Sequence, residues 1–418
     1  MSEAFETESS SRRRATAAAL GGGFLGKLVR DRVARLESGQ VLLREGSAEV
    51  RLGRAGSDLP TPTVTVRNAR FWRRVALGGS LGVAESFRDG DFDCDDLVTL
   101  CRLFVRDVDR LDRLETGLSR FGIALSRLAH RFRRNDRRGS KRNIRDHYDL
   151  GNDFFQLFLD ETLSYSCALF EKAEDDLLAA SINKLDIVCR KLELGPEDHL
   201  VEIGTGWGGL AIHAARAYGC KVTTTTISEA QFELAGERIS AAGLADRIDL
   251  RRVDYRDLDG RYDKLVSIEM IEAVGHENLP AYFARCDALL KPGGLALIQA
   301  ITIPDHRQDR YLREVDFIQS MIFPGSSVPS MAAMEAAWTG SSRLSLRHRD
   351  DHAGDYARTL AHWRRRFRAA EDAVRGLGFD ERFRRVWDFY LAYCEAGFAE
   401  GYSGLWQILL EKKGGAEA

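Results

Sequence analysis

The residues with the clearest chemical potential form a glycine-rich stretch, Val201-Glu202-Ile203-Gly204-Thr205-Gly206-Trp207-Gly208-Gly209. A short apolar run breaks into glycines there and resumes as a helix-like pattern at 210–215. Glycine adopts positive φ angles and has no Cβ, so the backbone can approach a ligand, and the next helix offers unpaired N–H groups. We therefore expect a strand, a ligand-binding turn and a helix. The alternative is an ordinary glycine-rich βα turn without a ligand.

The spacing of these glycines argues against a dinucleotide. The pattern is G-x-G-x-G-G rather than G-x-G-x-x-G, and no acidic residue closes the next predicted strand. A nicotinamide or flavin cofactor is therefore disfavoured. The acidic residue lies inside the first strand, at Glu202. In this respect the turn resembles that of S-adenosylmethionine-dependent methyltransferases.

Composition limits the class of protein. The chain has 418 residues, so two domains are expected, and its formal net charge of -2 gives no global electrostatic case for nucleic acid. Its seven cysteines include no C-x-x-C pair, and this odd, scattered set without a secretory leader predicts reduced thiols in the cytosol and no metal site. No apolar run reaches the roughly 18 to 20 residues of a membrane span. Any contact with lipid is therefore expected to be peripheral.

Alternating strand and helix patterns in the second half of the chain predict an α/β fold with a doubly wound, Rossmann-like sheet. The successive strand candidates are 199–204, 221–227, 248–253, 264–268 and 295–301, and 405–410 fits an added edge strand. Before that edge strand lies a long segment, 305–375, which we interpret as an insertion that builds a lid or substrate tunnel. Together these elements form one predicted domain, 146–418.

The first part of the chain predicts a smaller, lipid-binding-like α+β domain at 25–126. Residues 41–43, 48–52 and 63–66 have strand patterns, and the acidic pair Asp95-Asp96 opens an apolar-periodic helix. Residues 1–24 are expected to be a flexible N-terminus.

A basic linker at 127–145 separates the two predicted domains. Such a run is either a solvated linker or a surface attracted to anionic phospholipid headgroups, with nucleic acid as the third alternative. It carries nine Lys or Arg against one Asp: Arg127, Arg131, Arg133, Arg134, Arg137, Arg138, Lys141, Arg142 and Arg145.

Several segments, together with the glycine turn, resemble the cyclopropane fatty acid synthase and mycolic acid methyltransferase family over most of the chain. They are 147–155 (HYDLGNDFF), 163–168 (LSYSCA), 226–231 (TISEAQ), 254–257 (DYRD) and 267–275 (SIEMIEAVG). One such motif is weak evidence, whereas five in order are strong. The resemblance implies a class I methyltransferase that uses S-adenosylmethionine and acts on unsaturated phospholipid acyl chains. It also implies a cofactor-binding set, namely Tyr165, Ser166, Glu202, Gly204, Gly206, Thr226, Gln231, Asp254 and Tyr255.

The chemistry of this reaction explains the residue types. An alkene is a poor nucleophile, so methyl transfer builds positive charge on carbon and requires a pocket without water. Aromatic rings can stabilise that charge, and the candidates are Phe154, Phe155, Tyr165 and Tyr356. In the family, a bound bicarbonate held by Cys, Glu, His and Tyr then takes the proton. The corresponding positions here are Cys167, Glu272, Gln299 and Tyr356, with Cys394 as a secondary catalytic candidate.

Position 299 departs from the family pattern, because it is Gln instead of His. Gln can donate a hydrogen bond to an anion but cannot accept a proton or carry charge. Loss of a proton from the added methyl closes a cyclopropane, which is the first product expected. Loss from a neighbouring chain carbon gives a methylene or shifted alkene, which a reductase converts into a methyl branch of the 10-methyl type. Both products stay open as alternatives.

The resemblance also implies a cellular setting. The protein is expected in the cytoplasm, peripheral on the inner face of the membrane, with the phospholipid surface and an unsaturated acyl chain as partners and without nucleic acid. A homodimer and a partner reductase are compatible with it. Two rival hypotheses are a degenerate lipid-binding protein with this fold and a methyltransferase for small molecules or nucleic acid, although the sequence has no Asn/Asp-Pro-Pro-Tyr signature.

Overall fold

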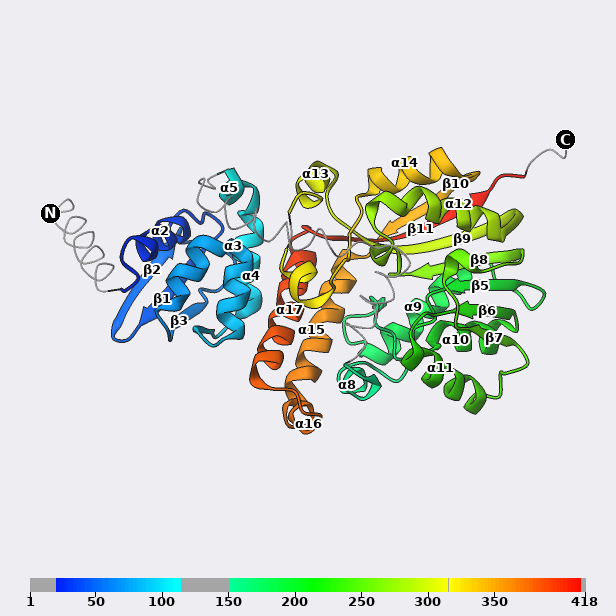
Figure 1. Cartoon of the computed structure of the whole chain (residues 1–418), viewed down its shortest axis with the longest axis horizontal. Coiled ribbons are helices and arrows are strands. Elements are labelled where there is room, and N and C mark those ends of the chain that lie inside the picture. The colour runs from blue at the N-terminus through cyan, green and yellow to red at the C-terminus, as the bar shows by residue number, and fades with distance from the viewer. Residues whose placement is uncertain (1–19, 114–149, 315, 415–418) are drawn as a thin grey trace. The chain divides into compact units, whose positions relative to one another are not determined.

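The computed structural model describes residues 20–113, 150–314 and 316–414 (Figure 1). These divide into two compact units, of which the first takes in residues up to 113 with 314–321 and 374–400. The second takes in 150–313, 322–373 and 401–414. Most of the predicted flexible N-terminus, the whole basic linker 127–145 and residues 147–149 of the HYDLGNDFF motif lie outside the described residues.

The first unit contains a four-stranded sheet with the strand order β2-β1-β3-β4. β1 and β2 form an antiparallel hairpin that turns at Gly46, which has a φ of 58°, and β3 runs parallel to β1. The strands predicted at 41–43, 48–52 and 63–66 are confirmed. The elements of this unit are α2 (Gly23–Val33), β1 (Gln40–Glu45), β2 (Ala48–Gly53), β3 (Thr63–Val66), α3 (Arg70–Arg88), β4 (Phe92–Cys94), α4 (Leu97–Arg106), α5 (Val108–Arg113) and α17 (Glu381–Ala399).

Two helices of this unit bear on the sequence predictions. α4 begins after Asp96, whose side chain accepts a hydrogen bond from the Thr99 N–H at 3.0 Å, so the acidic pair does open a helix. α17 packs in this unit through the rings of Phe87 and Phe389, whose centroids are 5.7 Å apart. The observed division therefore differs from the expected domain 146–418, because α17 belongs to the unit that contains the N-terminal sheet.

The second unit is a seven-stranded sheet with the order β10-β11-β9-β8-β5-β6-β7 (Figure 1). Five neighbouring strands, from β9 to β7, are parallel, and β11 is antiparallel to both of its neighbours. This arrangement confirms the predicted doubly wound, Rossmann-like sheet. The strands are β5 (His199–Ile203), β6 (Lys221–Thr225), β7 (Ile248–Arg251), β8 (Tyr262–Ile268), β9 (Leu290–Thr302), β10 (Leu344–Asp351) and β11 (Gly404–Lys412).

Helices cover both faces of this sheet (Figure 1). The apolar side chains of α12 and α14 pack with those of β8 and β9 in one core, and those of α9 and α10 pack with β5 and β6 in another. Burial on both faces explains why β5 and residues 295–301 of β9 are largely apolar rather than alternating. The helices are α8 (Asn152–Gln156), α9 (Leu177–Lys191), α10 (Gly209–Tyr218), α11 (Glu229–Ala241), α12 (Leu279–Leu289), α13 (Gln308–Tyr311), α14 (Met331–Ser341) and α15 (Ala353–Ala369), with α16 (Glu371–Gly376) at the boundary of the units.

The segment 305–375, expected as an insertion, contributes to the sheet architecture itself. It contains α14, whose Met334 and Trp338 lie in the apolar core, and the edge strand β10, which pairs with β11. The strand predicted at 405–410 is confirmed as β11. It is not the edge strand, because β10 lies outside it at that end of the sheet.

The strand order reverses beside β5, whose neighbours are β6 and β8. In open α/β sheets, ligands bind at such a reversal, beyond the carboxyl ends of the parallel strands. The glycine turn follows β5, and Thr226, Asp254 and Glu269 lie shortly after β6, β7 and β8. The fold therefore brings the predicted cofactor residues to one edge of the sheet. Within the described residues, no helix is long and apolar enough to cross a membrane.

Candidate active site

The glycine turn has the geometry that its sequence predicts. Gly204, Gly206 and Gly208 have φ angles of 101°, 54° and 84°, a region that favours glycine. The N–H groups of Gly204 and Thr205 donate to the carbonyl oxygen of Thr225 at 3.1 and 3.0 Å, which ties the turn to β6. A Cβ added at Gly206 would meet no other atom within 4 Å. The turn is therefore open to a ligand at Gly206, as a cofactor site requires.

Three predicted residues, one on β5 and two after β6, are held by buried hydrogen bonds. Thr226 Oγ1 donates to Gln231 Oε1 at 2.8 Å, and both side chains are buried. Glu202 is also buried and accepts a hydrogen bond from Thr224 Oγ1 at 2.5 Å. Burial raises the pKa of Glu202 to about 8. The neutral carboxyl is therefore favoured at physiological pH in this structure.

The predicted pair after β7 is held less directly. Asp254 accepts the guanidinium of Arg256 at 2.6 Å, so its carboxylate is engaged within its own loop. Tyr255 packs edge-on against Tyr282, and burial raises the pKa of Tyr255 to about 12. The structure places both residues at the carboxyl edge of the sheet.

Aromatic rings cluster beside the glycine turn. The Phe155 ring centroid lies 5.0 Å from that of Trp207 in the turn and 5.2 Å from that of Tyr165. The Tyr165 ring in turn lies 5.2 Å from Trp363 on α15, and Trp363 lies 6.1 Å from Tyr356. Phe155, Tyr165 and Tyr356 are therefore brought together as predicted, and Trp363 is an additional member that sequence reasoning missed.

A carboxylate lies at the centre of the predicted catalytic residues, and it belongs to Glu269. Its Oε1 accepts the backbone N–H of Cys167 at 2.9 Å and the Gln299 Nε2 at 2.8 Å. Its Oε2 accepts the Tyr356 hydroxyl at 2.6 Å. Burial raises the pKa of Glu269, and these three hydrogen bonds oppose the rise. Three of the four residues expected to hold an anion therefore hold a side chain of the protein.

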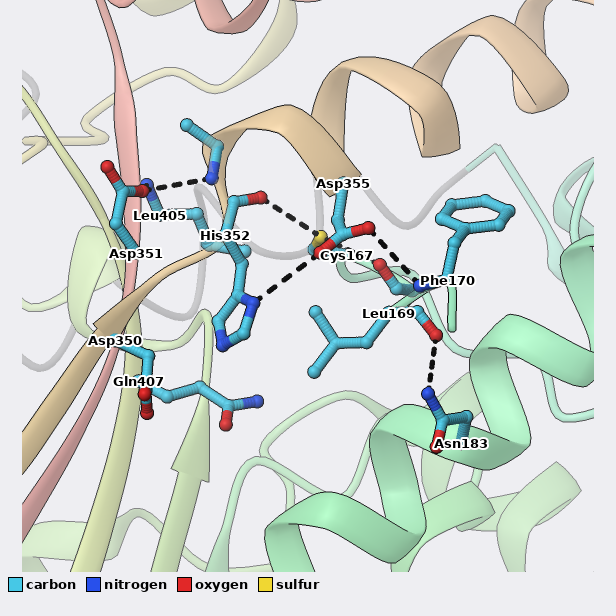
Figure 2. Close-up of polar contacts among 12 residues, drawn as sticks. Cys167, Leu169, Phe170, Asn183, Asp350, Asp351, His352, Asp355, Leu405 and Gln407 are labelled. Carbon is cyan, nitrogen blue, oxygen red and sulfur yellow. Dashed lines mark hydrogen bonds and ion pairs between the residues drawn. The ribbon is translucent and has the colours of Figure 1, made fainter. Parts of the chain in front are cut away.

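The thiol of Cys167 is fully buried, and its closest polar contact is a backbone carbonyl oxygen. It donates to the carbonyl oxygen of Ala168 at 3.1 Å and lies 4.0 Å from that of His352, at the start of α15 (Figure 2). Burial raises the pKa of the thiol well above its usual range. Cys167 therefore contributes its backbone N–H to the cluster, and its side chain stays protonated.

The segment that carries Cys167 is tied to α15 on its other side. The Phe170 N–H donates to Asp355 at 3.2 Å (Figure 2). The Ala168 N–H donates to Thr359 Oγ1 at 3.1 Å. Both acceptors lie on the helix that carries Tyr356. These bonds fix Cys167 and Tyr356 relative to each other.

Glu272 lies next to this cluster, in a single turn of 3₁₀ helix after β8. Its Oε1 accepts the Ile301 N–H at 2.6 Å, and its Oε2 is buried without a hydrogen-bond partner. Burial, with the neighbouring charge of Glu269, raises the pKa of Glu272 to about 8. The neutral carboxyl of Glu272 is therefore favoured near pH 7.

Sequence reasoning missed Glu269 and Lys184. Glu269 stands in the SIEMIEAVG segment only three residues before Glu272, and an acid directly after an apolar strand was the available signal. Lys184 occupies a buried position on α9 and donates to Ser166 Oγ at 3.1 Å. Burial lowers the pKa of Lys184. A lysine on the apolar face of a helix was the corresponding signal.

One predicted residue belongs to the first unit, whereas the cluster around Glu269 belongs to the second. Cys394 lies on α17 in the first unit, where burial and the neighbouring Asp316 raise the pKa of its thiol. Its secondary catalytic role stays a prediction. Among the residues that the structure describes, no group of three His, Cys, Asp or Glu side chains could hold a metal ion.

Comparison with known proteins identifies the family of this chain. The family model described as mycolic acid cyclopropane synthetase matches residues 135–408. The chain is 39% identical over 349 residues to the tuberculostearic acid methyltransferase of Mycobacterium tuberculosis. The aligned region covers 82% of this chain and 81% of that protein. It is 35% identical over 361 residues to the cyclopropane-fatty-acyl-phospholipid synthase of Escherichia coli, covering 84% of this chain and 87% of that protein.

A solved structure shows the same likeness. The crystal structure of a mycolic acid cyclopropane synthase complexed with SAH and CTAB superposes with a TM-score of 0.61 and is 30% identical. The match covers 65% of this chain and 98% of that one. With the glycine turn, the buried cluster and the sheet order, these matches show that the chain belongs to the mycolic acid cyclopropane synthetase family and is an S-adenosylmethionine-dependent methyltransferase.

Proposed function

We propose that the enzyme methylates the double bond of unsaturated acyl chains in membrane phospholipids, and that the product is a methylene- or methyl-branched chain. The observation that carries this proposal is the hydrogen bonding of Glu269. Cys167 N–H, Gln299 and Tyr356 all donate to its carboxylate. These are the donors that the family resemblance would assign to a bound bicarbonate. A separate anion does not fit this arrangement, because a carboxylate of the chain already accepts those bonds.

Glu269 is therefore the proposed general base. When bound, S-adenosylmethionine supplies a methyl group as an electrophile. The double bond gains that methyl and then loses one proton, so the net addition is one CH₂. Glu269 Oε1 already accepts two hydrogen bonds, whereas Oε2 accepts one from Tyr356. We assign the proton to Oε2, and the rings of Phe155, Tyr165 and Trp363 exclude water around the cationic carbon.

The identity of the base bears on the product. A carboxylate tethered to the end of β8 has one fixed position, so it selects one of the protons beside the positive charge. A relative that is named as a tuberculostearic acid methyltransferase, and not as a cyclopropane synthase, is 39% identical to this chain. Cyclopropane formation is the second candidate, supported by the 35% identity to the Escherichia coli cyclopropane-fatty-acyl-phospholipid synthase.

The proposal has consequences for partners and location. A methylene product keeps an unsaturation, so its conversion to a methyl branch needs a reductase that supplies a hydride and a proton, which together are two electrons and two protons. A phospholipid substrate requires peripheral contact with the inner face of the membrane, for which the basic linker is the candidate surface. A homodimer stays a prediction.

Glu269→Gln tests the base assignment. It keeps the side-chain size, and we expect turnover to fall by about 10²- to 10⁴-fold, as for loss of a general base, while binding of S-adenosylmethionine stays within a few-fold. Calorimetric titration with the cofactor and transfer of labelled methyl to dioleoyl phospholipid vesicles measure the two effects. Formate or bicarbonate should partly restore Glu269→Ala, because a small anion can then occupy the same three donors.

The matched control is Glu277→Gln, which removes an exposed carboxylate eight residues further along the chain. Its turnover should equal that of the wild type. A Glu269→Gln enzyme that works within a few-fold of the wild type would show that another group takes the proton.

A further inference from the structure

A row of polar side chains crosses the otherwise apolar sheet and ends at Glu269. Gln407 on β11 and Gln299 on β9 are cross-strand partners, and Asp350 on β10 is the partner of Gln407 on the other side. Gln299 in turn pairs with Ile268, the residue before Glu269. Gln407 is 1% exposed and Gln299 0% exposed. Two amides buried to this extent cost free energy unless each is fully hydrogen-bonded, so the row requires an explanation.

The hydrogen bonds of this row form an unbroken chain. Lys191 Nζ, at the end of α9, donates to Gln407 Oε1 at 2.6 Å. Gln407 Nε2 donates to Gln299 Oε1 at 2.9 Å, and Gln299 Nε2 donates to Glu269 Oε1 at 2.8 Å. Lys191 also pairs with Asp350 Oδ2 at 2.5 Å, and Figure 2 shows Asp350 beside Gln407.

The direction of the chain follows from the chemistry of its first member. An ammonium group has donors only, so Gln407 must turn its oxygen toward Lys191 and its NH₂ toward Gln299. Gln299 must then turn its oxygen toward Gln407 and its NH₂ toward Glu269. Without the cation, either amide could rotate, and Gln299 could present its oxygen to the carboxylate. Lys191 therefore determines which end of Gln299 meets the base.

We propose that Lys191 is a positioning residue for Glu269, and that it acts through the side-chain amides of Gln407 and Gln299 to keep an N–H on Glu269 Oε1. Amides do not pass on protons here, so the chain orients the base rather than carrying its proton away. The bond to Oε1 leaves Oε2 as the atom that accepts the proton. This inference rests on the proposed function of Glu269 as the base.

Other charged and titratable groups also face the base, and the test must separate their effects. They are Tyr356 from α15, Lys184 from α9, Cys167 and Glu272. At the outer end, Asp350 also accepts His348 Nε2 at 2.7 Å, and His348 is exposed. Substitutions at Lys191 or Gln407 leave the four groups beside the base in place, whereas Lys191→Met also removes the ion pair of Asp350.

Lys191→Met removes the cation and keeps the length of the stem. Because Glu269 Oε1 then loses a fixed donor, its pKa should rise, and the limb of the kcat profile that increases with pH should move up by about 0.5 to 1 pH unit. At pH values on the acidic side of that limb, turnover should fall about 3- to 10-fold relative to the wild type. The KM for S-adenosylmethionine should be unchanged. Lys191→Arg keeps the charge and the donors and should restore the wild-type profile.

A second variant tests the chain without touching Lys191. Gln407→Glu has the same shape and still accepts from Lys191, but an ionised carboxylate cannot donate to Gln299, so it should shift the profile in the same direction. Arg190→Met is the matched control, because Arg190 is an exposed neighbour of Lys191 that pairs with Asp186. It should leave the profile unchanged. Thermal unfolding checks that each variant is folded.

The outcomes are distinguishable from failure of the base assignment. Wild-type pH profiles for both Lys191→Met and Gln407→Glu, with an inactive Glu269→Gln, would overturn the positioning role and leave the base in place. An active Glu269→Gln would overturn both. A shifted profile in both variants, restored by Lys191→Arg, supports the proposal.

Discussion

Glu269 has an unusual backbone for a residue with a side chain. Its φ is 48°, in the left-handed region, at the point where β8 ends and the chain turns toward Glu272. This conformation costs on the order of 1 kcal/mol for a residue other than glycine. The turn directs its carboxylate onto the donors of Cys167, Gln299 and Tyr356, so the strain accompanies a functional position.

The charge state of Glu272 leads to a second prediction at the scale of single residues. Its pKa of about 8 lies above the ordinary value of 4.5, so it is neutral near pH 7. Glu272→Gln should therefore cost much less turnover than Glu269→Gln at that pH, about tenfold or less, because the amide replaces a neutral carboxyl. Side-by-side measurement of methyl transfer by the two variants checks this. A larger loss for Glu272→Gln would mean that Glu272 is the ionised base.

The same shift predicts the effect of pH on stability. The folded protein holds a proton on Glu272 that the unfolded chain releases near pH 4.5, so the stabilisation is fully present below that pH and is lost as pH rises through about 8. Glu272→Gln does not titrate. Between pH 6 and 9 its free energy of unfolding should fall less than that of the wild type, by on the order of 1 kcal/mol, in parallel urea titrations.

At the scale of elements, the glycine turn after β5 carries the cofactor prediction. Gly206→Val places a branched side chain where no atom of the protein lies within 4 Å, so we expect loss of S-adenosylmethionine binding. Gly243→Val is a matched control, because Gly243 also has a positive φ, 69°, and open space beside it, but it follows α11. Both variants bear the same backbone strain. Tight cofactor binding by folded Gly206→Val would contradict the assignment of this turn.

The elements differ in how far their sequences predict them. β5, β8 and β11 carry apolar runs because both faces of the sheet are covered, and β6 (KVTTT) is rich in β-branched residues, so their positions could be predicted. β10 could not, because most of its side chains are exposed and its sequence, LSLRHRDD, shows no apolar alternation. The place of α17 depends on contacts with α3 and α4, nearly 300 residues earlier, which no local pattern encodes.

The site was predictable in its parts but not in its centre. The motifs around Cys167, Gln299 and Tyr356 come from three distant segments, and the fold brings these residues together. That they meet on Glu269 depends on the left-handed turn at the end of β8. The partner of Gln299 depends on strand register, which places Gln407 opposite it. Backbone angles and strand register are set by the tertiary fold and cannot be predicted from a local sequence. The sequence analysis therefore named Glu272, and not Glu269, as the catalytic carboxylate.

At the scale of the whole molecule, the proposed function requires the enzyme to reach acyl chains inside a bilayer. The basic linker lies outside the described residues, and its proposed role in membrane contact is argued from charge alone. Changing Arg131, Arg133, Arg134, Arg137 and Arg138 to Gln should weaken binding to anionic vesicles and reduce its salt dependence, because such attraction is screened over about 8 Å at physiological ionic strength. Co-sedimentation across a salt series measures this. Unchanged binding would identify the run as a solvated linker.

The structure of the lipid product tests the central claim most directly. The purified enzyme is incubated with dioleoyl phospholipid vesicles and ¹³C-methyl-labelled S-adenosylmethionine, and the recovered fatty acids are examined by NMR. If Glu269 is the base in place of a bound bicarbonate, the label should appear in an exocyclic methylene or beside a shifted double bond, and ozonolysis should cleave the product. A product that carries the label wholly in a cyclopropane ring would contradict the account.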